Sequence, residues 1–156
     1  MLRPILTYPD PFLTKKAVSV PRVDDKVREL VRDMFETMRA ASGVGLAAPQ
    51  IGVGRRVIVV DVSPVEQESL PVALVNPEIA ERGGPVEGME GCLSVPGVEG
   101  LVPRAESVLV LGLDLQGEPV RIRATGFLAR ALQHEIDHLD GILFIDRIPA
   151  TAASAR

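Results

Sequence analysis

The two histidines of this chain, His134 and His138, lie one helical turn apart in sequence, and Glu135 follows the first of them. In an α-helix, side chains at this spacing stack on one face, so both imidazoles can bind one metal ion. The pattern H-E-x-x-H is typical of hydrolytic metal sites. The alternative is a core helix whose histidines only find hydrogen bonds, but a histidine pair at ligand spacing beside a carboxylate favours the metal site.

A catalytic metal site of this kind needs a third protein ligand and one open position. The chain has a single cysteine, Cys92, between Gly91 and the nearby Pro96, as expected where a bend aims a side chain. A lone cysteine is most often a small buried hydrophobe. Beside the histidine pair, however, it completes a set of two imidazoles and a thiolate, so we predict that Cys92, His134 and His138 are the metal ligands.

The predicted site has the parts of an amide hydrolase. A metal in it would acidify bound water and polarise a carbonyl group. Glu135 would take the proton of the attacking water and pass it to the leaving amine. The resulting oxyanion needs hydrogen-bond donors, and we expect the Gln50 side-chain amide and the Leu93 backbone N–H to supply them. The ligand set accommodates iron, zinc, nickel or cobalt, so it does not choose the metal.

Two helices and a series of strands must position these residues. Thr125 and Gly141 suit the ends of a helix that contains the H-E-x-x-H pattern. An amphipathic helix is predicted from Asp24 to about Ala41, and the proline-rich residues 1–22 are predicted to run as extended coil. Runs rich in β-branched residues predict strands at 56–62, 71–76, 79–81, 86–88, 98–102, 107–114, 119–124 and 142–145.

This order of elements predicts an α+β fold, with mixed or antiparallel sheets packed around a central C-terminal metal-binding helix and one amphipathic N-terminal helix. At 156 residues, with 46% hydrophobic and 24% charged residues, we expect one domain over residues 1–156. Its end, at about 148–156, is predicted to be a frayed tail.

The overall charge and the absence of long apolar runs limit the binding partners and the cellular compartment that we expect. A formal net charge of −4 gives no reason to expect nucleic acid or an anionic membrane as a partner. We see no apolar run of the length of a signal peptide or membrane span, and one cysteine agrees with a reducing compartment. We therefore expect a cytoplasmic protein.

Three segments carry a resemblance to a known family: residues 43–50 (GVGLAAPQ), 90–94 (EGCLS) and 133–139 (QHEIDHL). They resemble, in order, the three signature motifs of the peptide deformylases, and the similarity extends from about Leu6 to Gly141. The resemblance implies a bacterial or organellar enzyme that removes the formyl group from N-formylmethionine at the start of new polypeptides. It also implies Fe(II) as the metal, with zinc, nickel or cobalt as substitutes.

The resemblance also implies a role for each site residue. Glu135 is the catalytic acid and base, Gln50 and the Leu93 N–H stabilise the oxyanion, and Glu90 and Arg104 form a supporting ion pair. The small-residue segment would accept the peptide backbone as an added strand. The substrate-binding residues we expect are Gly43, Val44, Gly45, Gly91, Phe127, Leu128 and Ala131.

Two other functions remain open from the sequence: a zincin-type metallopeptidase, which also uses H-E-x-x-H, and a non-catalytic metal-containing binder of peptide N-termini. The expected partners are nascent polypeptides with N-terminal formylmethionine, and we expect a monomer. The chain ends soon after Arg147, without the basic C-terminal helix by which some bacterial relatives dock on the ribosome. We therefore expect no ribosome docking by that route.

Overall fold

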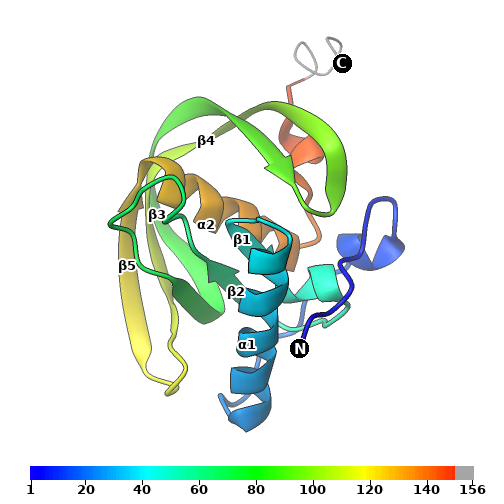
Figure 1. Cartoon of the computed structure of the whole chain (residues 1–156). Helices are drawn as coiled ribbons and strands as arrows, with labels where there is room; N and C mark the ends of the chain where they lie inside the picture. The colour runs from blue at the N-terminus through cyan, green and yellow to red at the C-terminus, as the bar shows by residue number, and fades with distance from the viewer. Residues whose placement is uncertain (150–156) are drawn as a thin grey trace.

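The computed structural model describes residues 1–149, which form an α+β fold with a five-stranded sheet and two α-helices (Figure 1). The proline-rich segment before the first α-helix contains the short 3₁₀ helix η1 and otherwise runs largely without regular structure, close to the prediction. The elements in chain order are η1 (Pro11–Thr14), α1 (Asp25–Ala40), β1 (Gly45–Ala47), η2 (Ala48–Ile51), β2 (Val57–Val60), β3 (Val72–Cys92), β4 (Val95–Leu113), β5 (Pro119–Thr125), α2 (Gly126–Leu139) and η3 (Phe144–Arg147).

The strands lie in the order β1-β2-β3-β4-β5, and each pairs antiparallel with its neighbours. Strands β3 and β4 are much longer than predicted. β3 includes residues 72–76 of one predicted strand and all of the predicted strands at 79–81 and 86–88, and β4 includes 98–102 and residues 107–113 of the strand predicted at 107–114. Three register shifts interrupt the β3–β4 ladder. The shift between Val75 and Glu78 lets Pro77 stay inside one continuous strand, and Gly84 takes a positive φ of 51° without ending that strand, although both positions look like strand ends in the sequence.

Helix α1 is the predicted amphipathic N-terminal helix. The Asp24 carboxylate caps it by accepting a hydrogen bond from the Val27 N–H at 3.1 Å. The buried face of the helix packs near β1 and β2 through Leu30, Val31, Met34 and Met38. This confirms the predicted buried face of α1. The helix ends shortly before the small-residue segment that forms β1 and η2.

Helix α2 lies in the middle of the fold, with the curved β3–β4 pair above it in the view of Figure 1. From Ala129 to Leu139 every residue of α2 is buried, and Leu132, Ile136 and Leu139 pack against the sheet in one apolar cluster. The predicted central C-terminal helix is therefore confirmed. Among residues 1–149, neither α-helix has the length and apolar composition needed to cross a bilayer.

The chain after α2 differs from the prediction. The strand predicted at 142–145 is wrong, because this segment leads into the 3₁₀ helix η3, where the Leu143 N–H donates to Asp146 Oδ2 at 3.0 Å. Leu143 and Phe144 are buried as core residues without a strand partner. Ile148, which we assigned to the tail, is also buried in that cluster. The rest of the predicted tail, from residue 150 on, lies outside the described residues.

Candidate metal centre and active site

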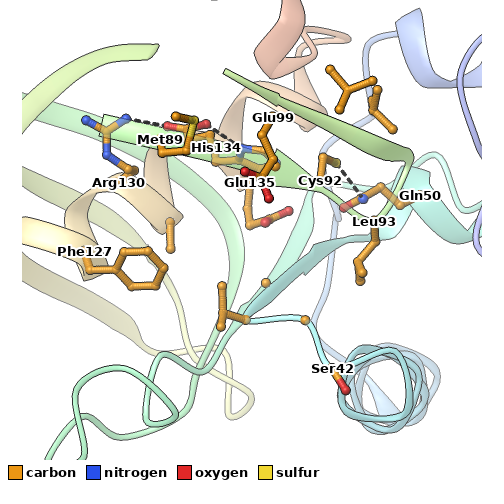
Figure 2. Close-up of a pocket in the computed structure, with 18 of the residues that line it drawn as sticks. Ser42, Gln50, Met89, Cys92, Leu93, Glu99, Phe127, Arg130, His134 and Glu135 are labelled. Atoms are coloured by element: carbon orange, nitrogen blue, oxygen red, sulfur yellow. Dashed lines mark hydrogen bonds and ion pairs between the residues drawn. The ribbon is translucent and has the colours of Figure 1, made fainter. Parts of the chain in front are cut away.

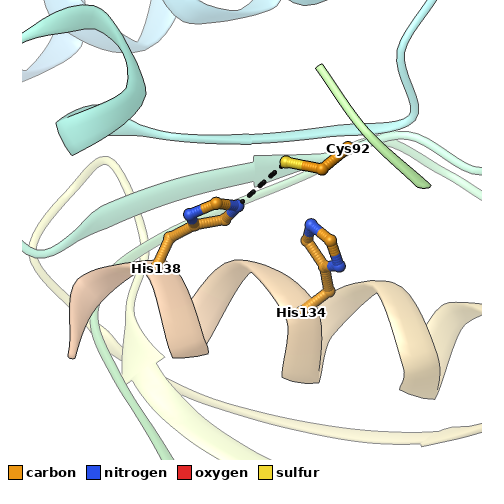
Figure 3. A group of neighbouring side chains, drawn as sticks. All are labelled: Cys92, His134 and His138. Atoms are coloured by element: carbon orange, nitrogen blue, oxygen red, sulfur yellow. Dashed lines mark hydrogen bonds between the residues drawn. The ribbon is translucent and has the colours of Figure 1, made fainter. Parts of the chain in front are cut away.

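Helix α2 presents its two histidines side by side toward Cys92, which ends strand β3 (Figure 3). The donor atoms of Cys92, His134 and His138 all lie within 4.8 Å of one another. Cys92 Sγ and His138 Nε2 lie 3.3 Å apart. Residues far apart in the sequence thus place one sulfur and two nitrogens around a common point, which confirms that these three side chains converge as predicted.

Two N–H donors surround the sulfur of Cys92. The Ser94 backbone N–H lies 3.4 Å from Sγ, and Gln50 Nε2 lies 3.6 Å from it. A register shift between Glu90 and Cys92 turns the strand at this point, so the side chain faces α2 instead of the outer face of the hairpin. These two donors hold the sulfur in place beside the histidines of α2.

The Glu90 carboxylate orients His134. Glu90 Oε1 lies 2.9 Å from His134 Nδ1, so that nitrogen carries the proton and Nε2 remains available as a ligand. Arg104 donates to both carboxylate oxygens, at 2.7 and 2.9 Å, and Arg130 donates to Oε2 at 2.6 Å. The Glu90–Arg104 ion pair implied by the family resemblance is therefore present. Asp137 extends it by accepting from Arg104 at 2.6 Å.

The pKa values of this cluster reflect burial and its charged partners. Burial raises the pKa of Glu90, but its hydrogen bonds with Arg104 and then His134 outweigh burial and lower the pKa to about 2. Burial lowers the pKa of His138 well below its ordinary value. Burial also acts to lower the pKa of His134, yet hydrogen bonds with Cys92 and Glu90 raise it to about 10. A divalent cation beside His134 would oppose that protonation, because it adds positive charge at the same place.

Glu135 is buried, and it lines a cavity together with Cys92 and His134. Burial raises the pKa of Glu135 to about 7, and its Oε1 has no hydrogen-bond partner among the described residues. A buried carboxylate oxygen normally has a partner, so this one is set to receive a water or substrate hydrogen. Gly45 makes the close approach possible, since a Cβ at that position would lie 2.9 Å from Glu135 Cδ.

The residues therefore fit a metal ion. A thiolate and two imidazoles are a common donor set for a divalent transition metal. The proton on His134 Nδ1 faces Glu90, as in other metal sites whose ligands are oriented by carboxylates. Glu135 follows the predicted ligand His134 in sequence and lines the same cavity. Its Oε1 has no hydrogen-bond partner among the described residues.

The predicted oxyanion donors lie beside Cys92. Gln50 is buried, its Oε1 accepts from the Ala47 N–H at 2.9 Å, and its Nε2 donates to Ser94 Oγ at 3.0 Å. These bonds fix the amide plane and turn Nε2 toward the metal ligands. Leu93 lies against Gly43 across the cavity, where a Cβ on Gly43 would collide with the Leu93 side chain. Gly43 thus keeps the cavity open at this end.

A cavity of about 610 Å³ opens in front of Glu135 (Figure 2). Leu128 was predicted to bind substrate, but it does not line this cavity and instead packs against the apolar core beneath α2. His138 also lies behind the cavity wall, almost fully buried. The predicted residues that do line it are Gly43, Val44, Gly45, Gln50, Gly91, Cys92, Leu93, Phe127, Ala131, His134 and Glu135.

Several residues that line the cavity were not predicted from the sequence: Ser42, Met89, Val95, Gly97, Val98 and Arg130. Those between residues 89 and 98 come from the end of β3 and the start of β4, where Glu90 pairs with Gly100. A prediction of one long hairpin around Cys92 would have brought these lining residues together. Because the sequence predicted several short strands instead, it did not indicate that they are neighbours.

Fold and site together define a metal-dependent hydrolase that carries the H-E-x-x-H pattern on a buried helix. A family model described as polypeptide deformylase matches residues 2–153. The chain therefore belongs to the peptide deformylase family, as its three motifs implied.

Individual relatives agree with this assignment. The peptide deformylase of Thermomicrobium roseum is 54% identical over 151 residues, which cover 94% of this chain and 86% of the relative. The crystal structure of the peptide deformylase from Thermus thermophilus is 46% identical with a TM-score of 0.92, covering 99% of this chain and 91% of that one. The structure from Legionella pneumophila is 48% identical with a TM-score of 0.90, covering 97% and 88%.

The function follows from the family. The chain is a peptide deformylase, a metal-dependent hydrolase that removes the formyl group from the N-terminus of newly synthesised polypeptides. The matches do not favour the zincin-type metallopeptidase or the non-catalytic binder that the sequence left open.

Proposed function

We propose that Cys92, His134 and His138 hold one Fe(II) ion and that Glu135 moves the proton during formyl hydrolysis. The convergence of the three donor atoms within 4.8 Å carries this proposal. When bound, the ion would polarise the formyl carbonyl and acidify a water molecule. Two imidazoles and a thiolate also accept zinc, nickel or cobalt, so iron comes from the family resemblance.

The choice of iron has its own test. Fe(II) beside a thiolate is sensitive to oxygen, so we expect activity to fall in air when the enzyme is loaded with iron and to persist when it is loaded with nickel or cobalt. The measurement is formate release after timed exposure to air, with metal analysis of anaerobically purified protein. Equal air stability of the iron and nickel forms would contradict this choice.

Glu135 is placed to act as the general base and then the general acid. Its unpaired, buried Oε1 can accept a proton from the attacking water. The same oxygen can then deliver the proton to the leaving amine of the methionine residue. Gln50 Nε2 and the Leu93 N–H stand as donors for the oxyanion, and the fixed amide plane of Gln50 lowers the cost of orienting its donor.

The substrate peptide would lie along β1. This strand is at the edge of the sheet, with β2 as its sheet neighbour, so its outer side can pair with an extended peptide. Gly43, Gly45 and Gly91 leave room for the peptide backbone in the cavity. The methionine side chain would enter the part lined by Val44, Phe127 and Ala131.

A substitution at Glu135 tests the catalytic role. We expect Glu135→Gln to keep its metal and lose about 100-fold or more in kcat, because general acid–base catalysis supplies about that much. The assay is formate release from formyl-Met-Ala-Ser with metal analysis of the same samples. Glu106→Gln is a matched control, since Glu106 is exposed on β4 and does not line the cavity. A metal-loaded Glu135→Gln variant with wild-type turnover would refute the role.

We also propose that the enzyme acts as a monomer in the bacterial cytoplasm. A single chain supplies the three ligands, the base and the lining of the cavity, so no second subunit is needed to complete the site. The relatives reported above are bacterial, and formylated polypeptides are made in that compartment.

A further inference from the structure

Glu99 places a negative charge at the edge of the substrate cavity. It is exposed, lies on β4 and lines the cavity, and Figure 2 shows its side chain projecting toward the middle of that space. Its stem covers Gly91, where a Cβ would lie 3.7 Å from Glu99 Cγ. The Glu99 side chain is therefore close to the backbone of Gly91, the residue before Cys92.

Within the described part of the chain, no lysine or arginine side chain of the cavity wall forms an ion pair with Glu99. Among residues 1–149, Arg130 is the only arginine or lysine that lines the cavity. Its guanidinium is already engaged, donating to Glu90 at 2.6 Å and to the carbonyl oxygens of Val102 and Val86 at 2.8 and 2.9 Å. Among the described residues, the cavity wall therefore offers no unengaged lysine or arginine to compensate the Glu99 carboxylate.

A peptide bound in the cavity would share it with this carboxylate. If the methionine side chain occupies the region of Phe127 and Ala131, the next residues continue toward the rim at about 3.3 Å per residue. Side chains of an extended peptide alternate in direction, so one of the two residues after the methionine faces the β4 wall. A lysine or arginine side chain is long enough to reach Glu99 from there.

From this geometry, we propose that Glu99 is a specificity residue that favours a positively charged side chain at the second or third position of the formylated substrate. The inference rests on the peptide path proposed above. An exposed ion pair contributes about 0.2–1 kcal/mol. This corresponds to a preference for lysine over glutamine of up to about five-fold in kcat/KM, with a comparable penalty for glutamate.

The test compares peptides that differ only in charge. The substrates are formyl-Met-X-Ser and formyl-Met-Ala-X, with X as lysine, glutamine or glutamate, at salt concentrations of about 0.02 M and about 0.5 M. The enzymes are the wild type, Glu99→Gln and Glu99→Lys. Glu106→Gln is the control, because it removes the same charge from the same strand outside the cavity.

We expect the wild type and Glu106→Gln to prefer lysine at low salt at one of the two positions. The preference should collapse in Glu99→Gln, reverse in Glu99→Lys and shrink at high salt, because screening weakens an exposed pair. Equal kcat/KM for the three peptides in the wild type, or an unchanged preference in Glu99→Gln, would overturn the inference while leaving the deformylase site intact. No turnover of the glutamine peptides would instead overturn the proposed site and this inference with it.

Discussion

The substitution Glu90→Gln tests whether the buried network behind His134 holds the site together. Glutamine has nearly the same shape as glutamate, but it carries no charge and one oxygen becomes an amide NH₂ that donates. Each Glu90 oxygen accepts two hydrogen bonds: Oε1 from Arg104 and His134, and Oε2 from Arg104 and Arg130. Whichever oxygen is replaced, the new donor therefore faces other donors.

The expected cost is large. Glu90 and Arg104 are almost fully buried, and removing one partner of a buried ion pair costs about 3–5 kcal/mol because the other charge stays buried without compensation. This is a large part of the roughly 5–15 kcal/mol that stabilises a domain. The loss of the Glu90–His134 bond should also weaken metal binding about 10- to 100-fold, as for other groups that orient a metal ligand.

The assay is urea unfolding of the metal-loaded protein, followed by metal competition with a chelator. Glu81→Gln is the matched control, because Glu81 also lies on β3 and pairs with Arg123, but at 3.7 Å with both side chains more than 60% exposed. Its free energy of unfolding should change by less than about 1 kcal/mol. If Glu90→Gln lost no more stability than Glu81→Gln and kept its metal affinity, the structural role assigned to the network would be wrong.

Three further substitutions follow from close contacts and charge. Gly45→Ala would push a Cβ into the Glu135 carboxylate. We expect kcat to fall about 100-fold with little change in metal content, because small misplacements of a reacting group cost about that much. Normal formate release by the variant would contradict this. Gly88→Ala would place a Cβ 2.7 Å from Arg130 Cζ, so Arg130 would have to move. Because Arg130 lines the cavity, we expect KM for formyl-Met peptides to rise several-fold. An unchanged KM would argue against this role of Arg130. Hydrogen bonds with Ser63, and then Arg39, lower the pKa of Asp61 below its ordinary value of 3.8. Its contribution to folding is therefore present above about pH 3.8 and lost as pH falls through the lower folded pKa. The difference in unfolding free energy between wild type and Asp61→Asn should shrink in acid, and a difference that stays constant with pH would refute it.

The metal ligands were predictable from helical spacing and from the small number of histidines and cysteines in the chain. Helical spacing brings His134 and His138 together without knowledge of the rest of the fold, and Cys92 was the one thiol available. The face of α1 followed from its apolar periodicity in the same way. These features depend on residues that are neighbours in one helix or unique in the chain, so tertiary structure did not need to be known.

The cavity wall was less predictable because it depends on contacts between distant segments. Arg130 reaches Glu90 and the carbonyl of Val102 only because β3 and β4 form one long, irregular ladder over α2. Leu128 lies between predicted pocket residues in sequence, but helix rotation turns it into the core. The segment at 142–145 looked like a strand because it is apolar, and burial without strand pairing gives the same pattern.

The most direct test of the site is the metal content of Cys92→Ala, measured by elemental analysis of anaerobically purified protein beside the wild type. We expect about one metal ion per chain in the wild type and a large loss in the variant, with the fold retained by circular dichroism, because a catalytic site of this type needs its third protein ligand. Full metal occupancy in a folded Cys92→Ala variant would show that the sulfur is not a ligand, and it would contradict the central claim.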